Sequence, residues 1–305
     1  MAYMGSAWSR CTRRFDEVEA YIETSWSVAP RSNLQYRADL YGTWVLMTYA
    51  ACQYSLEEIG RACLDFLGSR AGGPRKLTDD VRRAHLRLTI NAVRRALDDG
   101  SRLTDADLML QNIQSSRWAE HSALMAIERN VWPDYVREWL LRLGVEGNSL
   151  AWMQQAAPGK TETYYSRMNA LVAERNPIAH GVAAGQTLNA QLMQDWLCDC
   201  RGFVEKCAMA VGEHLVRTYR PRLRKVGLLN TDLALGARTA ALHACLEDLA
   251  VGDHLVLKSS QSVRIARVES MMSHDTHLRS APRGTAEVAV VLSKKHGNCN
   301  LYLVP

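Results

Sequence analysis

The chain of 305 residues lacks several patterns that would assign it to common classes of protein. It has eight cysteines but no Cys-x-x-Cys, which argues against a zinc ribbon and against thioredoxin-like redox chemistry. No apolar run approaches the roughly 20 residues that a membrane-spanning helix needs. The first residues also lack the apolar stretch of a signal peptide. We therefore expect a cytoplasmic protein with reduced thiols, small buried cysteines and no membrane partner.

Familiar catalytic patterns are missing as well. The glycines from Gly68 to Gly73 have Walker-like spacing, but no Gly-Lys-Ser/Thr follows them, so Ala71–Pro74 is predicted to be a loop. His274 and His277 have metal-like spacing but no further ligands nearby, which favours an exposed loop. The sequence thus predicts neither a metal site nor a cofactor.

Positive charge is distributed unevenly along the chain. Residues 222–305 hold 11 lysines and arginines against 7 acidic residues, whereas residues 1–221 hold 26 against 25. A basic C-terminal part is compatible with a nucleic-acid partner. Solubility and chance explain the same charge equally well.

The pattern of the first 220 residues is typical of helices. Phe15, Val18, Ile22 and Trp26 recur at helical spacing. A capping-box pattern at Ser55-Leu56-Glu57-Glu58 predicts that one helix ends near Tyr54 and another begins. Further helices are predicted near residues 78–98, from about 105, from Pro133, from about Thr161 and over 189–219.

The pattern changes after Pro221. Alternation at period two predicts strands at 253–258, 263–268, 286–292 and 301–304, with turn residues between them. We therefore predict a mainly α protein with two domains: a helical domain over residues 1–221 and a small antiparallel β-barrel over residues 222–305.

The stretch Arg175-Asn176-Pro177-Ile178-Ala179-His180-Gly181 is the strongest functional signal. Arginine presents a planar fork of donors that fits a phosphate, and histidine can move a proton near neutral pH. With 30 arginines and nine histidines, about one Arg–His pair at this spacing is expected by chance, and the chain has two. The second, Arg238 with His243, lacks the Asn and the Gly, and it lies in the β-like region.

The Arg175–Gly181 string resembles the catalytic signature of HEPN domains, in which an arginine is followed four to six residues later by a histidine. The Arg-Asn start and His-Gly end resemble the subgroup of bacterial defence and toxin-like ribonucleases. Weaker similarity lies in residues 34–67 and in Asn112–Gly144, including Ile127-Glu128-Arg129-Asn130-Val131. The resemblance covers roughly the first 220 residues.

The resemblance implies a metal-independent endoribonuclease in which the ribose 2′-hydroxyl attacks the adjacent phosphate. Arg175 would stabilise charge on that phosphate, and His180 would transfer a proton. Asn176 would orient the histidine or the phosphate. Many family members build a composite site from two subunits, so one motif per chain implies a homodimer. The substrate would be tRNA, mRNA or rRNA, and an antitoxin or regulatory protein could be a partner.

The C-terminal part resembles the second, β-barrel domain of translation elongation factors at Val251-Gly252-Asp253-His254 and at 281–290. Such barrels contact RNA or ribosomal surfaces. The resemblance implies a set of candidate RNA-binding residues: Lys258, Arg264, Arg267, Arg279, Arg283, Lys294 and Lys295. A solvated barrel face explains these residues equally well.

Other interpretations remain open at this point. Arg175 could pair with a carboxylate, and His180 could be a hydrogen-bonded residue at a helix end. A helix face rich in arginine could guide RNA or could simply be solvated; it comprises Arg82, Arg83, Arg87, Arg94 and Arg95. For the whole protein, the alternative to a ribonuclease is a non-catalytic adaptor that binds RNA or protein.

Overall fold

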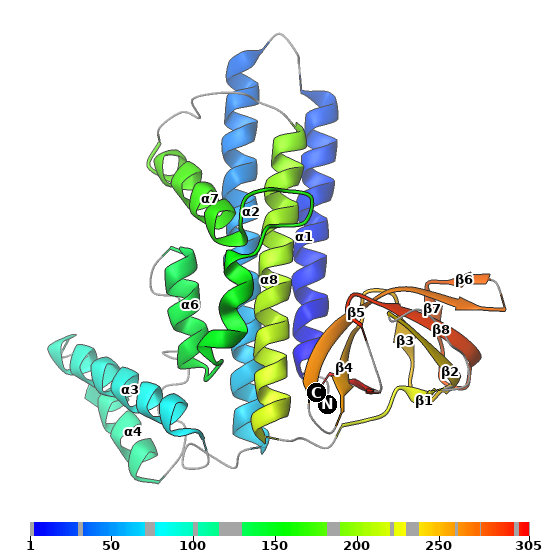
Figure 1. The fold of residues 1–305 in the computed structure, drawn as a ribbon. Helices are drawn as coiled ribbons and strands as arrows, with labels where there is room; N and C mark the ends of the chain where they lie inside the picture. Colours follow the sequence, from blue (N-terminus) through cyan, green and yellow to red (C-terminus); the bar gives the residue numbers. More distant parts are fainter. Residues whose placement is uncertain are drawn as a thin grey trace. The chain divides into compact units, whose positions relative to one another are not determined.

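The protein is described here from a computed structural model (Figure 1). The structure describes residues 3–29, 33–70, 77–99, 103–115, 130–181, 190–219, 223–229, 238–259, 262–274, 276–295 and 299–304. The chain forms two compact units, one of Ala7–Val211 and one of Gly212–Pro305 with Met1–Ser6. The loop predicted at Ala71–Pro74 lies outside the described residues.

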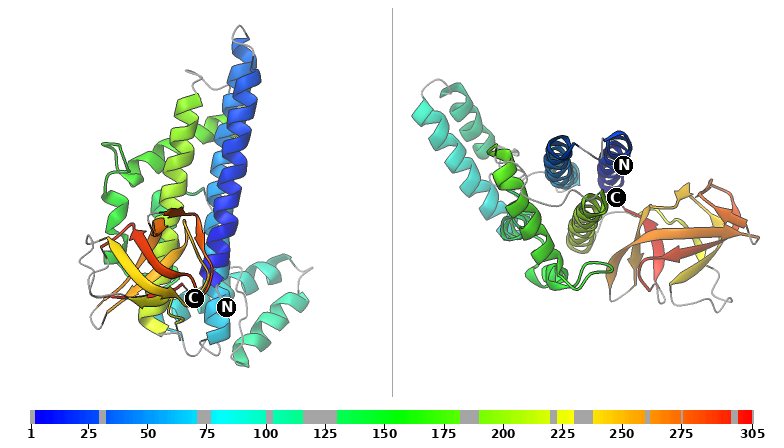
Figure 2. Two further views of the ribbon diagram at one scale, coloured as in Figure 1. Left: turned by 90° about the vertical axis from the view of Figure 1, so that its right-hand side faces the viewer. Right: turned by 90° about the horizontal axis from the view of Figure 1, so that it is seen from above.

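Three long helices form the centre of the helical unit and run side by side (Figures 1 and 2): α1 (Tyr3–Val28), α2 (Leu34–Arg70) and α8 (Ala190–Tyr219). The predicted apolar stripe of α1 is confirmed at Phe15, Val18 and Ile22, which are fully buried, whereas Trp26 is only partly buried. Each fully buried side chain of this size contributes about 1.5–3 kcal/mol relative to an exposed one.

The α2 helix is continuous where the sequence predicted two helices. The break expected near Tyr54 was wrong, because Ser55 is fully buried and helical geometry continues past it. The carbonyl of Ser55 accepts a hydrogen bond from the Cys11 thiol at 3.6 Å. Glu58, expected to cap a new helix, instead accepts a 2.5 Å hydrogen bond from Arg10 Nε of α1. Packing against α1 therefore overrides a local capping signal.

Shorter helices complete the unit: α3 (Asp79–Asp99), α4 (Leu103–Gln114), α6 (Pro133–Arg142), the 3₁₀ helix η2 (Gly147–Gln154) and α7 (Tyr164–Ala179). The positions of α3, α4, α6 and α7 agree with the predicted ones, and α6 begins at Pro133 as expected, whereas η2 was not predicted. In the part of the chain that the structure describes, no helix combines the length and apolarity needed to cross a membrane.

The second unit is an antiparallel sheet. Its main strands follow the order β1 (Gly227–Leu229), β2 (Thr239–Cys245), β8 (Ala286–Leu292), β5 (Val263–Ser273), β4 (His254–Lys258) and β9 (Asn300–Leu303). A short β6 (Thr276–Leu278) pairs with β5, and β3 (Leu249–Ala250) pairs with β7 (Ser280–Ala281). The four predicted strands are present as β4, β5, β8 and β9, whereas β2 and the short strands β1, β3, β6 and β7 were not predicted.

The sheet curls around its own core. Val226 N donates to Leu301 O at 3.1 Å and Leu303 N to Arg224 O at 3.0 Å, which ties the segment before β1 to β9. Inward-facing apolar residues fill the interior, among them Leu242, Leu257, Val268, Val290 and Leu301. The predicted fold class, a mainly helical protein followed by a small antiparallel barrel, is confirmed.

Candidate functional site

The Arg175 motif lies at the C-terminal end of α7. Thr163 caps the start of this helix, and its side-chain oxygen accepts a hydrogen bond from Ser166 N at 3.1 Å. The buried face of α7 consists of Tyr164, Met168, Leu171 and Val172. Burial of this face fixes the rotation of the helix, and so it fixes the side to which the motif residues point.

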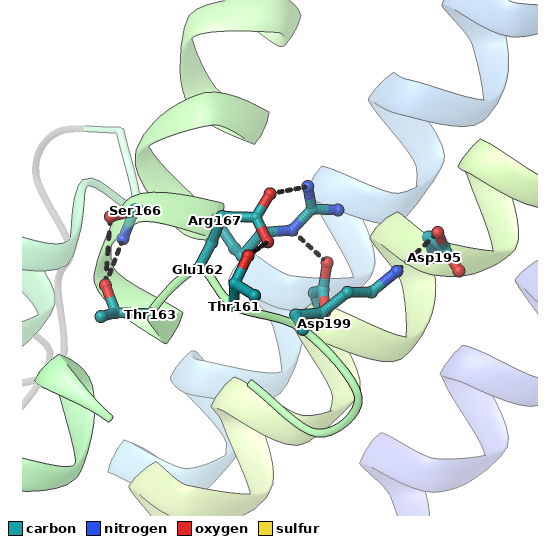
Figure 3. Close-up of polar contacts among 8 residues, drawn as sticks. Thr161, Glu162, Thr163, Ser166, Arg167, Asp195 and Asp199 are labelled. Atoms are coloured by element: carbon teal, nitrogen blue, oxygen red, sulfur yellow. Dashed lines mark hydrogen bonds and ion pairs between the residues drawn. The ribbon is translucent and has the colours of Figure 1, made fainter. Parts of the chain in front are cut away.

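Ion pairs fasten α7 and the segment just before it to α8 (Figure 3). Arg167 Nε lies 2.6 Å from Asp199 Oδ2. Its guanidinium stacks 4.2 Å from the ring centroid of Trp196. Lys160 Nζ lies 2.6 Å from Asp195 Oδ2, one turn before Asp199 on α8. Burial raises the pKa of Asp199, and the opposing effect of the Arg167 hydrogen bond is smaller. Asp199 therefore depends on Arg167 to remain charged.

A close approach between α2 and α7 sets the position of the motif from the other side. A side chain at Gly42 would place its Cβ 3.3 Å from Ile178 Cγ2, so glycine permits this contact. Next to it, burial raises the pKa of Tyr41 to about 12, and the negative charge of Glu174 adds to the shift. The phenol therefore stays protonated beside α7 at neutral pH.

Proline and glycine shape the end of the motif. Pro177 lies in the last turn of α7 and supplies no N–H, so the regular helical bond ending at this position is missing. His180 N donates to Asn176 O at 3.3 Å and Pro177 O at 3.1 Å. Gly181 then adopts φ of +81°, a left-handed conformation that ends a helix and favours glycine. His180 is thereby held at the tip of α7.

The Arg175 guanidinium is held by neutral groups. Nη1 donates to Asn176 Oδ1 at 3.2 Å and to Asn130 Oδ1 at 3.5 Å, and the guanidinium carbon lies 4.7 Å from the ring centroid of Tyr49. Nε is buried without an acceptor. Among the described residues, no carboxylate forms an ion pair with Arg175. Among the described residues, the cation is therefore fixed in position without a carboxylate that neutralises it.

Two residues of this cluster were given no role from the sequence. Asn130 Nδ2 donates to Asn176 Oδ1 at 3.0 Å, and Tyr49 donates to Asn130 Oδ1 at 3.3 Å. Tyr49 in turn accepts from Val131 N at 2.9 Å. Asn130 lies in the segment that supported the family resemblance, although the preceding residues 116–129 lie outside the described part. Tyr49 carried no local signal, because its partner is 81 residues away.

The His180 side chain is exposed. It makes no hydrogen bond to any described residue, including Arg175. The alternative in which His180 is a hydrogen-bonded residue at the helix end therefore has no support within the described chain. Asn176 reaches His180 only through its main-chain carbonyl, and its side chain orients Arg175 instead.

The barrel candidates lie on several strands and turns of the sheet. Lys258 ends β4, and Arg264 and Arg267 lie on β5, where Arg264 pairs with the inward-facing Leu257. Arg283 lies in the turn before β8, where its main-chain N–H binds Asp248. Lys294 Nζ lies 2.9 Å from Glu213 Oε1, so its charge is already paired. Arg279 and Lys295 are exposed.

The second Arg–His pair occupies a different environment. Arg238 donates to Leu292 O at 2.8 Å and forms an ion pair with Glu269. His243 is exposed on β2. A carboxylate therefore neutralises Arg238, whereas Arg175 has no such partner among the described residues. Within the described residues, no group of three or more His, Cys, Asp or Glu side chains is placed to hold a metal ion.

Comparison with protein families supports the interpretation of the helical unit. Residues 9–208 match the family model described as RiboL-PSP-HEPN. No curated protein shows a significant match to the chain. The matched range includes α7 and every residue of the Arg175 cluster, and it covers about two thirds of the chain. The chain therefore belongs to the RiboL-PSP-HEPN family.

Proposed function

We propose that this protein is a metal-independent endoribonuclease. The observation that carries the proposal is the Arg175 guanidinium, held by two amide oxygens and no described carboxylate, on the same helix end as the exposed His180. An unneutralised cation suits a phosphate that gains negative charge in the transition state. Membership of a HEPN family agrees with a function related to RNA.

The proposed reaction uses the nucleophile of the substrate. The ribose 2′-oxygen bonds to the adjacent phosphorus, the bond from phosphorus to the 5′-oxygen breaks, and a 2′,3′-cyclic phosphate remains. His180 accepts the proton of the 2′-hydroxyl or donates one to the departing 5′-oxygen. In a homodimer, each site would combine Arg175 of one subunit with His180 of the other. We propose a toxin or antiviral defence role for such an activity.

The decisive experiment compares two Arg–His pairs at equal spacing. Arg175→Ala and His180→Ala should each lower RNA cleavage by about 10²-fold or more. His243→Ala, an exposed histidine five residues after Arg238, should cleave like the wild type. Excess chelator should not inhibit, and RNA with a 2′-deoxyribose at the cleaved position should resist. Wild-type cleavage by the His180 variant, or loss of activity on chelation with rescue by a divalent ion, would contradict the proposal.

The barrel over residues 222–305, proposed as a separate domain, is assigned to substrate choice. Lys295 is exposed, whereas Lys294 is bound to Glu213, so Lys295 is the better test of the proposed RNA contacts. Lys295→Glu should weaken binding to a folded tRNA or rRNA. It should also lower the salt slope, meaning the steepness with which the logarithm of affinity falls with the logarithm of salt concentration, by about 0.7–0.9 per lost phosphate contact. The exposed Lys225 provides the matched Lys→Glu control. Equal effects of both variants would contradict this assignment.

A further inference from the structure

A groove of about 890 Å³ lies between α3 and α6, away from the Arg175 cluster. Side chains from α3 line one wall and side chains from α6 the other, and the charged ones are Asp80, Arg83, Arg87, Glu138 and Arg142. Its volume falls in the range of sites that enclose a whole small ligand. Three arginines against two carboxylates give the lining a net charge of +1.

The α3 wall presents cations that a ligand can use. Arg87 is exposed and has no hydrogen-bonding or ion-pair partner among the described residues. Arg83 lies 3.8 Å from Asp80, but their side chains are 80% and 85% exposed, so water competes strongly with that contact. Both guanidiniums are therefore available to phosphate oxygens, which they can bind with two parallel hydrogen bonds.

Only some of the arginines on α3 line the groove. Arg82 is also exposed, but it does not line the groove. It lies five residues before Arg87, which places it about 140° away around the helix axis. The arginine-rich face of α3 noted in the sequence is therefore not one surface, because Arg83 and Arg87 line the groove and Arg82 does not.

The α6 wall supplies groups suited to a base. The half-buried Tyr135 offers an aromatic face for stacking, and Glu138 and Asn91 offer hydrogen-bonding groups for a base edge. The same helix leads toward the Arg175 cluster. It begins at Pro133, three residues after Asn130, and Asp134 accepts a hydrogen bond from Tyr165 of α7 at 2.8 Å.

We propose that this α3–α6 groove binds single-stranded RNA, with phosphates on Arg83 and Arg87 and an unstacked base against Tyr135. The inference rests on the proposed function only in taking the bound strand to be the substrate. A protein helix would need an apolar groove, whereas only three of the lining residues are apolar: Ala84, Leu88 and Leu141. The mixture of guanidinium, phenol, amide and carboxylate fits a nucleotide.

The test measures binding by the full-length protein without cleavage. In the His180→Ala background, a fluorescent 12-nucleotide single-stranded RNA is titrated by anisotropy at several salt concentrations. Arg87→Glu should raise the Kd about tenfold and lower the salt slope by about 0.7. Tyr135→Leu should raise the Kd about tenfold for this RNA, the size of a lost stacking contact. It should leave the Kd for a duplex of the same sequence unchanged, since duplex bases are already stacked. Arg82→Glu is the charge-matched control.

Two results would contradict the proposal that the α3–α6 groove binds single-stranded RNA. One is an Arg82→Glu effect equal to that of Arg87→Glu, which would indicate general electrostatic attraction. The other is a Tyr135→Leu variant that weakens duplex and single strand alike, or neither. Circular dichroism of every variant confirms that it is folded. Failure of the proposed function would show instead as absence of cleavage by the wild type, while the binding differences between the groove variants and Arg82→Glu persist.

Discussion

At the scale of residues, the candidate site depends on what surrounds Arg175 rather than on its spacing from a histidine. Arg175 and Arg238 each precede a histidine by five residues. Arg238 is paired with Glu269, whereas Arg175 meets only amide oxygens and an aromatic ring among the described residues. A guanidinium fixed by neutral acceptors keeps its charge for a ligand, which is the condition that transition-state stabilisation requires.

Asn130→Asp tests this condition with little change in size. The new carboxylate would lie where Asn130 Oδ1 now accepts from Arg175, and it would compete with phosphate for the guanidinium. We expect RNA cleavage to fall by about 10²-fold, the usual cost of losing one stabilising group. Cleavage rates under saturating RNA, with thermal melting to check the fold, provide the measurement.

The control for this substitution is Asn112→Asp, which makes the same change on α4. It should leave the cleavage rate near that of the wild type. An Asn130→Asp protein that is folded and fully active would show that the neutral surroundings of Arg175 are not needed.

At the scale of elements, α7 is positioned by contacts from two directions. Gly42 of α2 admits Ile178, and Asp199 of α8 binds Arg167. The side chains of Arg167 and Asp199 are only 13% and 6% exposed, so their ion pair is shielded from water. Loss of one partner would leave the other charge buried without a counter-charge. The resulting loss of folding free energy is larger than that caused by breaking an exposed pair.

Arg167→Ala should therefore lower the free energy of unfolding by about 3–5 kcal/mol at neutral pH. Burial already raises the pKa of Asp199, and removal of the cation would raise it further. A raised carboxyl pKa favours the fold at low pH and opposes it as pH rises through that pKa. The loss of stability should therefore shrink on acidification, as measured by urea unfolding at several pH values.

A second substitution and a surface control accompany this experiment. Asp199→Asn in the Arg167→Ala background should recover stability, because it removes the stranded charge. Arg14→Ala breaks an exposed pair with Glu17 and should change stability by less than about 0.5 kcal/mol. An Arg167→Ala cost as small as that of Arg14→Ala would contradict the shielding argument.

At the scale of the whole molecule, one chain presents Arg175 and His180 without a hydrogen bond between them. A homodimer would bring two copies of each residue to an isologous contact. If one subunit contributes the arginine and the other the histidine, two different inactive variants can complement each other. The Arg175→Ala subunit still supplies His180, and the His180→Ala subunit still supplies Arg175.

Co-expression of Arg175→Ala with His180→Ala should therefore restore cleavage. Random assembly gives heterodimers in about half of the molecules, and these have one complete site. The expected rate lies well above either variant alone and below half of the wild-type rate. Light scattering measures the oligomeric state of the same preparations. A fully active monomer, or dimers without recovery, would contradict a shared site.

The sequence by itself determined the helical and β-rich regions and the motif. Apolar residues at helical spacing, such as Phe15, Val18 and Ile22, must face a core, and alternation after Pro221 must form strands. The Arg175–Gly181 string was equally visible, since its order and its closing glycine are local properties. The resemblance to a HEPN domain followed from that string and agrees with the family match.

Only the tertiary structure decided what these signals mean in space. Because Ser55 is buried against α1, α2 continues as one helix past the position where the sequence predicted a break. Tyr49 and Asn130, far apart in the chain, meet Arg175 because α2 and the segment just before α6 lie beside the end of α7. Local sequence patterns indicate which backbone conformation a segment prefers and which of its faces is buried. Whether a charged side chain is neutralised or available to a ligand depends on partners that are distant in the sequence. Whether an arginine is neutralised is therefore a property of the fold.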